Sequence, residues 1–417
     1  MLLNLKSWVF KLSLPSSSIS TSLSTPALPP LSLYVHIPWC VQKCPYCDFN
    51  SHALKGGIPE TEYVAHLLDD LTADLQYVQS RKISTIFFGG GTPSLLSEEA
   101  MATLLKGIED RVPFADDIEI TLEANPGTLE TNKFEGFAKA GVNRISIGVQ
   151  SFELEKLVQL GRIHNSEEAL KAAGFAHDSV STFNLDLMHG LPNQSLDQAL
   201  SDVKQAIALN PFHISWYQLT IEPNTLFHSK PPVLPEDDTL WDIQQHGHEL
   251  LTEAGYEQYE ISAYSKPGHQ CRHNLNYWKF GDYLGIGCGA HGKITVQTDE
   301  VELAQGDSQT QPQIKVIRTE KVKHPKGYMD FTKPYTYKSW QVEADDLPFE
   351  YFMNRLRLKS AFSMEEFEQR TGLLMSSQQA SLAKALELEL LTKIDDNCYK
   401  TTSKGIRYYN NLVDLFL

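Results

Sequence analysis

Residues 31–47 read LSLYVHIPWCVQKCPYC, an apolar run followed directly by three cysteines. Cys40, Cys44 and Cys47 are spaced C-x3-C-x2-C. Three such thiolates can each hold one iron of a cubane iron-sulfur cluster, which leaves the fourth iron for a ligand that is not a protein side chain. A zinc site usually has two separated C-x2-C pairs or added histidines, and cysteines of a hydrophobic core are usually scattered along the chain. The spacing therefore favours an iron-sulfur cluster with one open iron.

Downstream of the cysteines, short apolar runs alternate with longer amphipathic segments. Near-continuous apolarity is typical of buried parallel strands, and a 3.6-residue period is typical of the helices that cover them. The predicted strands are residues 31–37, 83–88, 118–122, 144–149, 182–188 and 213–221. The predicted helices are residues 60–79, 97–108, 129–140, 166–177, 196–209 and 237–254. Six successive β-α units predict an α/β fold, either a doubly wound sheet or a full or partial barrel, with its chemistry at the carboxyl ends of the strands.

This alternation divides the 417 residues into four predicted segments. Residues 1–30 are rich in serine and proline and fit a disordered tail, with a targeting segment or a start codon placed too far upstream as alternatives. Residues 31–262 hold the β-α units. Residues 263–348 are Gly-rich and polar and are expected to be a connecting and lid region, in which residues 299–313 form an exposed connection. Residues 349–417 are expected to form a small, mostly helical, winged-helix-like domain.

The composition limits the classes of partner. A net charge of −16 argues against sequence-independent binding of nucleic acid phosphates. Residues 350–417 add no basic face, because they hold nine Lys or Arg and nine Asp or Glu. No apolar run approaches a transmembrane length. The other cysteines, Cys271, Cys288 and Cys398, lie far apart, which fits a reducing compartment better than a disulfide framework. These features predict a cytoplasmic protein that is not transmembrane and does not bind nucleic acid.

The C-x3-C-x2-C spacing resembles the signature of the radical S-adenosylmethionine (SAM) superfamily. The resemblance implies that Cys40, Cys44 and Cys47 hold a 4Fe-4S cluster. It further implies that the amino and carboxylate groups of S-adenosyl-L-methionine chelate the open iron, and that an electron from the cluster cleaves the sulfonium. Among the arrangements open to the six units, it favours a partial (β/α)6 radical SAM barrel.

A glycine-rich turn follows the second predicted strand and reads Gly89-Gly90-Gly91-Thr92-Pro93. Glycines let a ligand approach the backbone closely, although such a turn by itself is more often only a tight connection between a strand and a helix. Beside the cysteine loop, it resembles the GGTP motif with which radical SAM proteins hold the methionyl amino group.

Polar residues follow the next predicted strands. Glu123 ends the third strand, Gln150 ends the fourth, and Asp186 lies on the fifth, while Arg162 follows one helical segment after Gln150. A carboxylate can accept hydrogen bonds from a ribose or an amino group, and an arginine can bind the methionine carboxylate. Singly, each residue also fits a structural role such as an ion pair or a helix cap. Together, at successive strand ends, they predict one pocket.

Four segments together resemble the oxygen-independent coproporphyrinogen III oxidase-like group of radical SAM proteins. They are YVHIP at 34–38, GGGTP at 89–93, EANP at 123–126 and NLDLMHGLP at 184–192. The resemblance runs from about residue 31 to the C-terminal domain. The SAM contacts that it implies are Tyr34, Tyr46, Gly90, Gly91, Thr92, Glu123, Gln150, Arg162 and Asp186.

One position departs from the decarboxylating oxidases of this group. Those enzymes carry a further cysteine two residues after the triplet, whereas this chain has Cys47-Asp48-Phe49. A phenylalanine side chain neither ligates iron nor donates a proton. This departure argues against oxidase activity, and the position resembles that of the heme chaperones of the same group, which also have phenylalanine there.

The segment HNLNYW at residues 273–278 is a second resemblance to those heme chaperones. An imidazole is a common axial ligand of heme iron, and Tyr277 and Trp278 could pack against a porphyrin face. The resemblance thus implies His273 as a heme ligand. The same segment fits equally well a loop that is anchored by a hydrogen-bonded histidine and two core aromatics.

These resemblances imply a heme-binding chaperone that carries a 4Fe-4S cluster and SAM and transfers heme to an acceptor protein. The alternative is a coproporphyrinogen III oxidase that converts two propionates to vinyls, and a third reading is a radical enzyme with an unrelated substrate. Whether the protein is an enzyme is left open. Cleavage of SAM would require an electron donor such as a flavodoxin or a ferredoxin, and a homodimer is an oligomeric state that the sequence leaves open.

Overall fold

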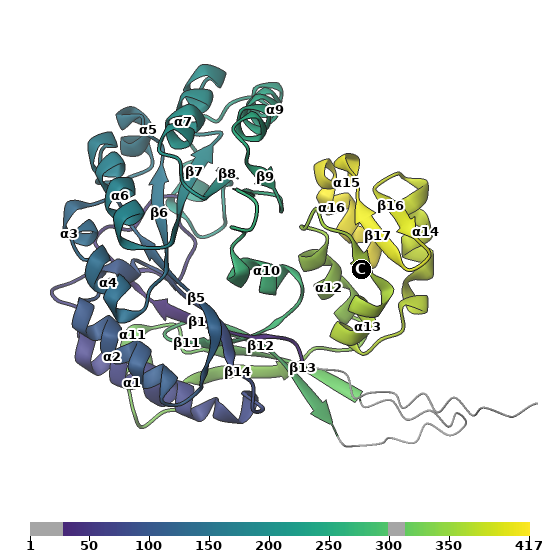
Figure 1. Cartoon of the computed structure of the whole chain (residues 1–417), viewed down its shortest axis with the longest axis horizontal. Helices are drawn as coiled ribbons and strands as arrows, with labels where there is room; N and C mark the ends of the chain where they lie inside the picture. The colour runs from purple at the N-terminus through teal and green to yellow at the C-terminus, as the bar shows by residue number, and fades with distance from the viewer. Residues whose placement is uncertain (1–27, 299–312) are drawn as a thin grey trace, which may run out of the picture.

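A mixed β-sheet forms the larger part of the protein (Figure 1). The computed structural model describes residues 28–298 and 313–417. The predicted tail up to residue 27 and residues 299–312 of the predicted connection at 299–313 therefore lie outside the described residues, whereas Gln313 begins a strand. Within the described residues the sheet has twelve strands, in the order β14-β13-β12-β11-β1-β4-β5-β6-β7-β8-β10-β9, in which the edge strand β9 is Glu257–Gln258.

Six neighbouring strands of this sheet are parallel, as the six predicted β-α units require. These strands are β1 (Leu31–Ile37), β4 (Ile83–Gly90), β5 (Phe114–Ala124), β6 (Arg144–Gln150), β7 (Thr182–His189) and β8 (His213–Gln218). The main helices that alternate with them are α1 (Glu60–Ala73), α2 (Glu98–Glu109), α4 (Phe134–Ala140), α6 (Ser166–Ser179), α7 (Leu196–Ala208) and α9 (Asp237–Glu253). All six predicted strands and all six predicted helices have a counterpart in these elements.

Several bounds differ from the prediction. The helix predicted at 129–140 is divided into α3 (Thr128–Thr131) and α4, and α1 ends at Ala73, where a short 3-10 helix (Leu75–Tyr77) follows. The starts of α6 and α7 agree closely with the sequence because Asn165 and Ser195 form capping boxes with the third residue of each helix.

The two faces of the parallel strands differ in chemistry. In β1 the apolar face packs in the main core, and its members are Leu31, Leu33, Val35 and Ile37. Ser32, Tyr34 and His36 occupy the alternate positions, and the Ser32 hydroxyl accepts a hydrogen bond from Thr85 of β4 at 2.7 Å. The strands therefore carry a row of polar residues toward their carboxyl ends on the face away from this core.

Residues 263–348 add strands to both edges of the parallel sheet. The added strands are β10 (Ala263–Ser265), β11 (Asp282–Ile286), β12 (His291–Thr298), β13 (Gln313–Lys321) and β14 (Thr336–Gln341). β11 pairs in parallel with β1, whereas β10 pairs antiparallel with β8, and β12 to β14 continue antiparallel from β11. Because β11 to β13 are antiparallel neighbours without covering helices between them, no β-α period predicts them.

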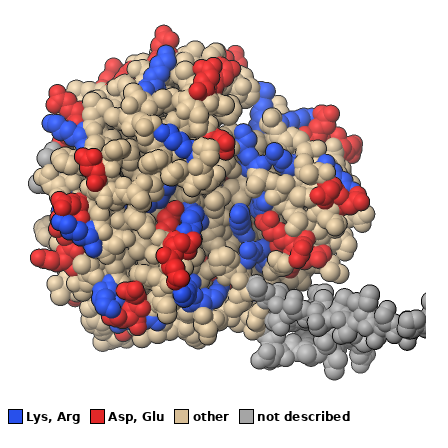
Figure 2. All heavy atoms as spheres, in the orientation of Figure 1, with Lys and Arg blue, Asp and Glu red and all other residues tan. Residues whose placement is uncertain are grey.

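The C-terminal residues form a small unit beside the sheet (Figure 1), and its core also includes Phe280 and Val316 of the larger unit. Its elements include α12 (Leu347–Arg355), α13 (Met364–Thr371), α14 (Gln379–Glu387) and the three-stranded sheet β15-β17-β16, made of Phe362–Ser363, Cys398–Thr401 and Leu391–Asp395. Arg357 joins this unit to the larger one, because its guanidinium contacts Glu260 at 3.2 Å and lies 4.3 Å from the ring centre of Trp278. Lys and Arg side chains gather along the seam between the two units (Figure 2).

The predicted α/β class with a small, mostly helical C-terminal domain is confirmed. Among the described helices, none combines the length and the apolar character that spanning a membrane requires.

Candidate functional site

A cavity of about 370 Å³ opens at the carboxyl ends of the parallel strands. The three cysteines of the predicted cluster motif line it, together with eight of the ten residues predicted to bind cofactors. Those eight are Tyr46, Gly90, Gly91, Thr92, Glu123, Gln150, Arg162 and Asp186. The structure thus brings together residues that the sequence placed at the ends of different strands.

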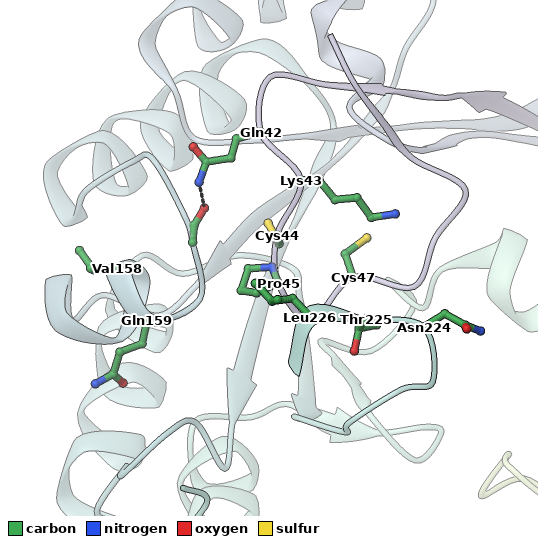
Figure 3. Close-up of a pocket in the computed structure, with 11 residues that line it drawn as sticks. Gln42, Lys43, Cys44, Pro45, Cys47, Val158, Gln159, Asn224, Thr225 and Leu226 are labelled. Atoms are coloured by element: carbon green, nitrogen blue, oxygen red, sulfur yellow. Dashed lines mark hydrogen bonds between the residues drawn. The ribbon is translucent and has the colours of Figure 1, made fainter. Parts of the chain in front are cut away.

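The cysteine loop joins β2 (Trp39–Cys40) to β3 (His52–Ala53), which pair as two short parallel strands. The side-chain amide of Gln42 donates a hydrogen bond to the carbonyl oxygen of Gly161 at 3.0 Å, which ties the loop to the segment after α5 (Leu154–Gln159). Figure 3 shows the outer side of this loop, where a second cavity of about 500 Å³ lies. Its lining outside the loop includes Val158, Gln159, Asn224, Thr225 and Leu226.

The three thiols are free and partly exposed. Arg162 Nη1 lies 3.6 Å from Cys44 Sγ, and the Ser51 hydroxyl lies 3.7 Å from Cys47 Sγ. Among the described residues, no three His, Cys, Asp or Glu side chains come close enough to share one metal ion. Cysteines that each bind a different iron of a cubane need not converge on one point, so three free thiols at the rim of a cavity fit a cluster with one open iron.

The glycine-rich turn fits closely between β1 and the cysteine loop. Gly90 has φ +109°, and a Cβ atom at this position would lie 2.4 Å from the ring of His36. A Cβ atom at Gly91 would lie 2.5 Å from the carbonyl oxygen of Trp39, whose oxygen also accepts the amide hydrogen of Thr92 at 2.8 Å. Only glycine fits these two positions, and their exposed backbone lines the cavity.

Arg162 forms a polar wall of the cavity. Its Nη2 donates to Asn125 Oδ1 at 2.5 Å and to the carbonyl oxygen of Gly148 at 2.8 Å. Asn125 in turn donates to the Thr92 hydroxyl at 3.2 Å. Asn125 was not among the predicted site residues, although it directly follows β5, and residues at the carboxyl ends of the parallel strands share the edge where the site lies.

Glu123 and Asp186 are two carboxyl groups in the same cavity. Asp186 accepts hydrogen bonds from the Ser146 hydroxyl and from the Asn184 side chain, both at 2.8 Å. Burial, and then the nearby charge of Asp186, raises the pKa of Glu123 to about 8. Glu123 is therefore largely protonated near neutral pH when the cavity holds no ligand, and it can act as a hydrogen-bond donor or acceptor.

This raised pKa predicts how Glu123→Gln changes stability with pH in the ligand-free protein. The folded protein holds the proton of Glu123 more tightly than the unfolded chain, so the resulting stabilisation is complete below about pH 4.5 and is lost as the pH rises through about 8. Glutamine cannot ionise. At about pH 9 the variant should therefore be more stable than the wild type by up to about 5 kcal/mol, since the pKa rises from 4.5 to about 8 and each pKa unit corresponds to about 1.4 kcal/mol.

Chemical denaturation at several pH values measures this difference. Glu135→Gln is the control, because Glu135 is an exposed carboxylate paired with Lys139 at 2.6 Å. The control should leave the pH dependence above neutrality unchanged. A Glu123→Gln protein that loses stability between neutral and alkaline pH as steeply as the wild type would contradict the assignment.

Tyr34 lies behind the cavity and does not line it. Its hydroxyl is hydrogen-bonded to His36 Nδ1 at 3.0 Å, and its ring lies close to Gly89, where a Cβ atom would come within 3.1 Å of Tyr34 Cε2. In this arrangement Tyr34 supports the glycine-rich turn through His36 and Gly89.

The structure does not bring His273 into the cavity. His273 lies on α10 (Arg272–Trp278) and is 1% exposed. Its Nδ1 is hydrogen-bonded to the Thr85 hydroxyl at 2.7 Å and its Nε2 to the Tyr277 hydroxyl at 2.9 Å. Burial lowers the pKa of His273 to about 3. Binding of heme iron by this imidazole would require at least one of the two hydrogen bonds to break.

Comparisons with known proteins agree with this geometry. The chain matches the radical SAM superfamily over residues 34–205 and the HemN C-terminal domain over residues 342–408. It is similar in fold to coproporphyrinogen III oxidase (HemN) from Escherichia coli, with a TM-score of 0.76 and 23% identity over 93% of this chain and 90% of that one. The chain is therefore a radical SAM protein with the HemN-like fold, which confirms the predicted radical SAM architecture with its C-terminal domain.

Two curated relatives define its family more narrowly. The chain is 58% identical to the heme chaperone HemW of Escherichia coli (strain K12) and 55% identical to that of Haemophilus influenzae, in each case over 94% of this chain and 99% of the relative. It belongs to the heme chaperone HemW family.

Proposed function

We propose that this protein binds heme, a 4Fe-4S cluster and SAM, and transfers heme to an acceptor protein. The observation that carries the proposal is that three free cysteines, a glycine-rich turn, an arginine and two carboxyl groups line one cavity. Membership of the HemW family supports heme as the cargo.

The cluster residues are Cys40, Cys44 and Cys47. When bound, the cluster supplies an open iron for SAM and an electron for its cleavage. In this proposal the backbone at Gly90 and Gly91 holds the methionyl amino group, because both glycines line the cavity and admit close approach.

The remaining contacts belong to the rest of SAM. Arg162 pairs with the methionine carboxylate, since its guanidinium lines the cavity beside Cys44. Glu123 and Asp186 accept hydrogen bonds from the ribose. Gln150, which ends β6 with a φ of +66°, also lines the cavity around the bound SAM. Tyr46, Thr92 and Tyr34 complete the proposed contacts, with Tyr34 acting from behind the turn.

Phe49 favours a chaperone over an oxidase. Its side chain is 60% exposed and lines the cavity close to the cysteines. A phenyl ring at this position cannot ligate iron or move a proton. Anaerobically reconstituted protein supplied with reductant, SAM and coproporphyrinogen III should therefore form no protoporphyrinogen IX. Formation of that product would overturn the chaperone proposal in favour of the oxidase.

His273 remains the proposed heme ligand. Because its imidazole is buried and hydrogen-bonded, the test measures protein stability as well as heme binding. His273→Ala should weaken heme binding in a Soret titration while the absorption of the reconstituted cluster stays intact. Because Thr85 and Tyr277 both bond to this imidazole, the variant should also lower the Tm. A variant that loses stability but keeps full heme affinity would show that His273 only anchors α10.

We also propose two protein partners, a heme acceptor and an electron donor. The acceptor is a heme-binding protein, and a flavodoxin or a ferredoxin acts as electron donor only if SAM is cleaved. We further propose a cytoplasmic location, which suits three free thiols that must stay reduced.

A further inference from the structure

Asn50 joins the cysteine loop to two distant parts of the chain. It lies three residues after Cys47. Its Nδ2 donates hydrogen bonds to the carbonyl oxygens of Cys288 and Lys323, both at 2.9 Å, and lies 3.6 Å from Cys288 Sγ. Its own carbonyl oxygen is 3.0 Å from His36 Nε2. One residue thus ties the end of the loop to β1, to the turn between β11 and β12, and to the segment that follows β13.

The turn between β11 and β12, to which Asn50 is hydrogen-bonded, is fixed by buried side chains. The amide of Gly287 donates to Asp70 Oδ2 at 3.1 Å and to the Tyr328 hydroxyl at 3.0 Å. The amide of Cys288 donates to the Tyr63 hydroxyl at 3.0 Å. Because these partners are buried in the core, the carbonyl oxygen of Cys288 is a fixed point to which the cysteine loop can be attached.

The turn also leaves space for the Asn50 side chain. Gly289 has φ +75°, and a Cβ atom there would lie 2.3 Å from Asn50 Nδ2. Any larger residue at this position would displace the amide group from its two carbonyl partners.

The loop is fastened differently on its two sides. Before Cys47, Gln42 bonds to Gly161, and the carbonyl oxygen of Pro45 accepts the amide hydrogen of Phe227 at 2.9 Å. In the segment after Cys47, the carbonyl oxygen of Phe49 accepts a hydrogen bond from Nζ of the exposed Lys43 at 3.3 Å. Both residues belong to the loop, so this contact does not attach the loop to the rest of the chain. Asn50 therefore attaches this second half, through its side chain, to the turn after β11 and to the segment after β13.

We infer that Asn50 is a positioning residue for the iron-sulfur cluster. It fixes the segment after Cys47, and with it Ser51, whose hydroxyl lies 3.7 Å from Cys47 Sγ. Outer partners of this kind orient metal ligands and set how tightly the metal is held. The inference rests on the proposed function, because it presupposes that the three cysteines hold a cluster.

The sharpest test is Asn50→Asp in the full-length protein. The change keeps the shape of the side chain but replaces the donor group with a carboxylate oxygen that faces two carbonyl oxygens. After anaerobic reconstitution, the rate of iron loss to a chelator should rise by about tenfold or more relative to wild type. The electron paramagnetic resonance signal of the reduced cluster should also change. Asn50→Ala, which removes the donor without adding a charge, should have a smaller effect of the same sign.

Asn143→Asp is the matched control. Asn143 Nδ2 donates to the carbonyl oxygen of Ile118 at 2.8 Å, and its Oδ1 accepts the amide hydrogen of Ile120 at 2.8 Å, near the amino-terminal end of β6. The control loses the same kind of donor and should change stability without accelerating iron loss. If both Asp variants lose iron at the same rate, Asn50 has only a general structural role and the inference fails.

Two glycine-to-alanine variants, one beside Asn50 and one far from any neighbour, give an independent test. Gly289→Ala should reproduce the faster iron loss of Asn50→Asp, because its methyl group would displace Asn50. Gly268→Ala is the control, since Gly268 has φ +80° but no atom within 4 Å of the added Cβ position. If wild type itself takes up no cluster, the proposed function fails together with this inference. If wild type takes up the cluster and Asn50→Asp keeps it equally long, the inference alone is overturned.

Discussion

Replacing Cys44 with serine is expected to leave a folded protein that no longer holds a complete 4Fe-4S cluster or binds SAM. Cys44 lies between the two cavities and next to Arg162, whose Nη1 is 3.6 Å from its sulfur. A serine hydroxyl is a poor ligand for iron because it remains protonated at neutral pH. Since losing even an outer partner typically costs 10–100-fold in metal affinity, the loss of a direct ligand should lower SAM affinity by more than about tenfold.

Iron and sulfide analysis after reconstitution, together with equilibrium SAM binding, measures this effect. Cys398→Ser serves as the control, because Cys398 is a half-buried cysteine on β17 in the C-terminal unit, outside both cavities. It should retain the wild-type iron content. Full iron content and SAM affinity in the Cys44→Ser protein would refute the cluster assignment.

Replacing Lys321 with methionine is expected to produce the largest loss of stability. Lys321 Nζ lies 2.6 Å from Asp70 Oδ1 and 2.7 Å from Asp74 Oδ2, and the Lys321 and Asp70 side chains are fully buried. Methionine fills the space of the lysine stem but leaves two carboxyl groups without their cation. Removing one partner from a buried ion pair typically costs about 3–5 kcal/mol. The free energy of unfolding, measured by denaturant titration, should fall by about this amount at neutral pH.

The pH dependence separates this mechanism from simple misfolding. Burial raises the pKa of Asp70 to about 6, and Lys321 opposes that rise. Without the lysine the pKa of Asp70 should rise further above that of the unfolded chain, so the folded variant gains stability on acidification as this carboxyl group becomes neutral. The difference from wild type should therefore be smaller at about pH 5 than at about pH 7.5.

Lys323→Met is the matched control for this prediction. Lys323 lies two residues further on, and its side chain is 65% exposed, with Glu320 Oε1 at 2.7 Å. An exposed ion pair contributes at most about 1 kcal/mol. Equal losses of stability in the Lys321 and Lys323 variants would contradict the account of a buried, charge-compensated core.

The sequence could predict the parallel strands and most of the cavity because both follow local rules. Apolar runs of strand length identify β1 and β4 to β8, and residues at the carboxyl ends of parallel strands must share one edge of the sheet. That is why Glu123, Gln150 and Asp186 come together as predicted, although 63 positions separate the first from the last.

Long-range partners could not be predicted in the same way. Whether His273 is free or hydrogen-bonded depends on Thr85, 188 residues away. The role of Asn50 depends on carbonyl groups at Cys288 and Lys323, 238 and 273 residues away, which carry no sequence signal. β11 likewise pairs with β1 across the whole series of β-α units, and its short, glycine-containing sequence resembles a loop.

Soret titration of the anaerobically reconstituted wild type with heme shows whether the protein carries heme together with an iron-sulfur cluster. We expect a Soret band that saturates with added heme while the absorption of the cluster is retained. A titration without saturation, or uptake of heme only as the cluster is lost, would contradict this expectation.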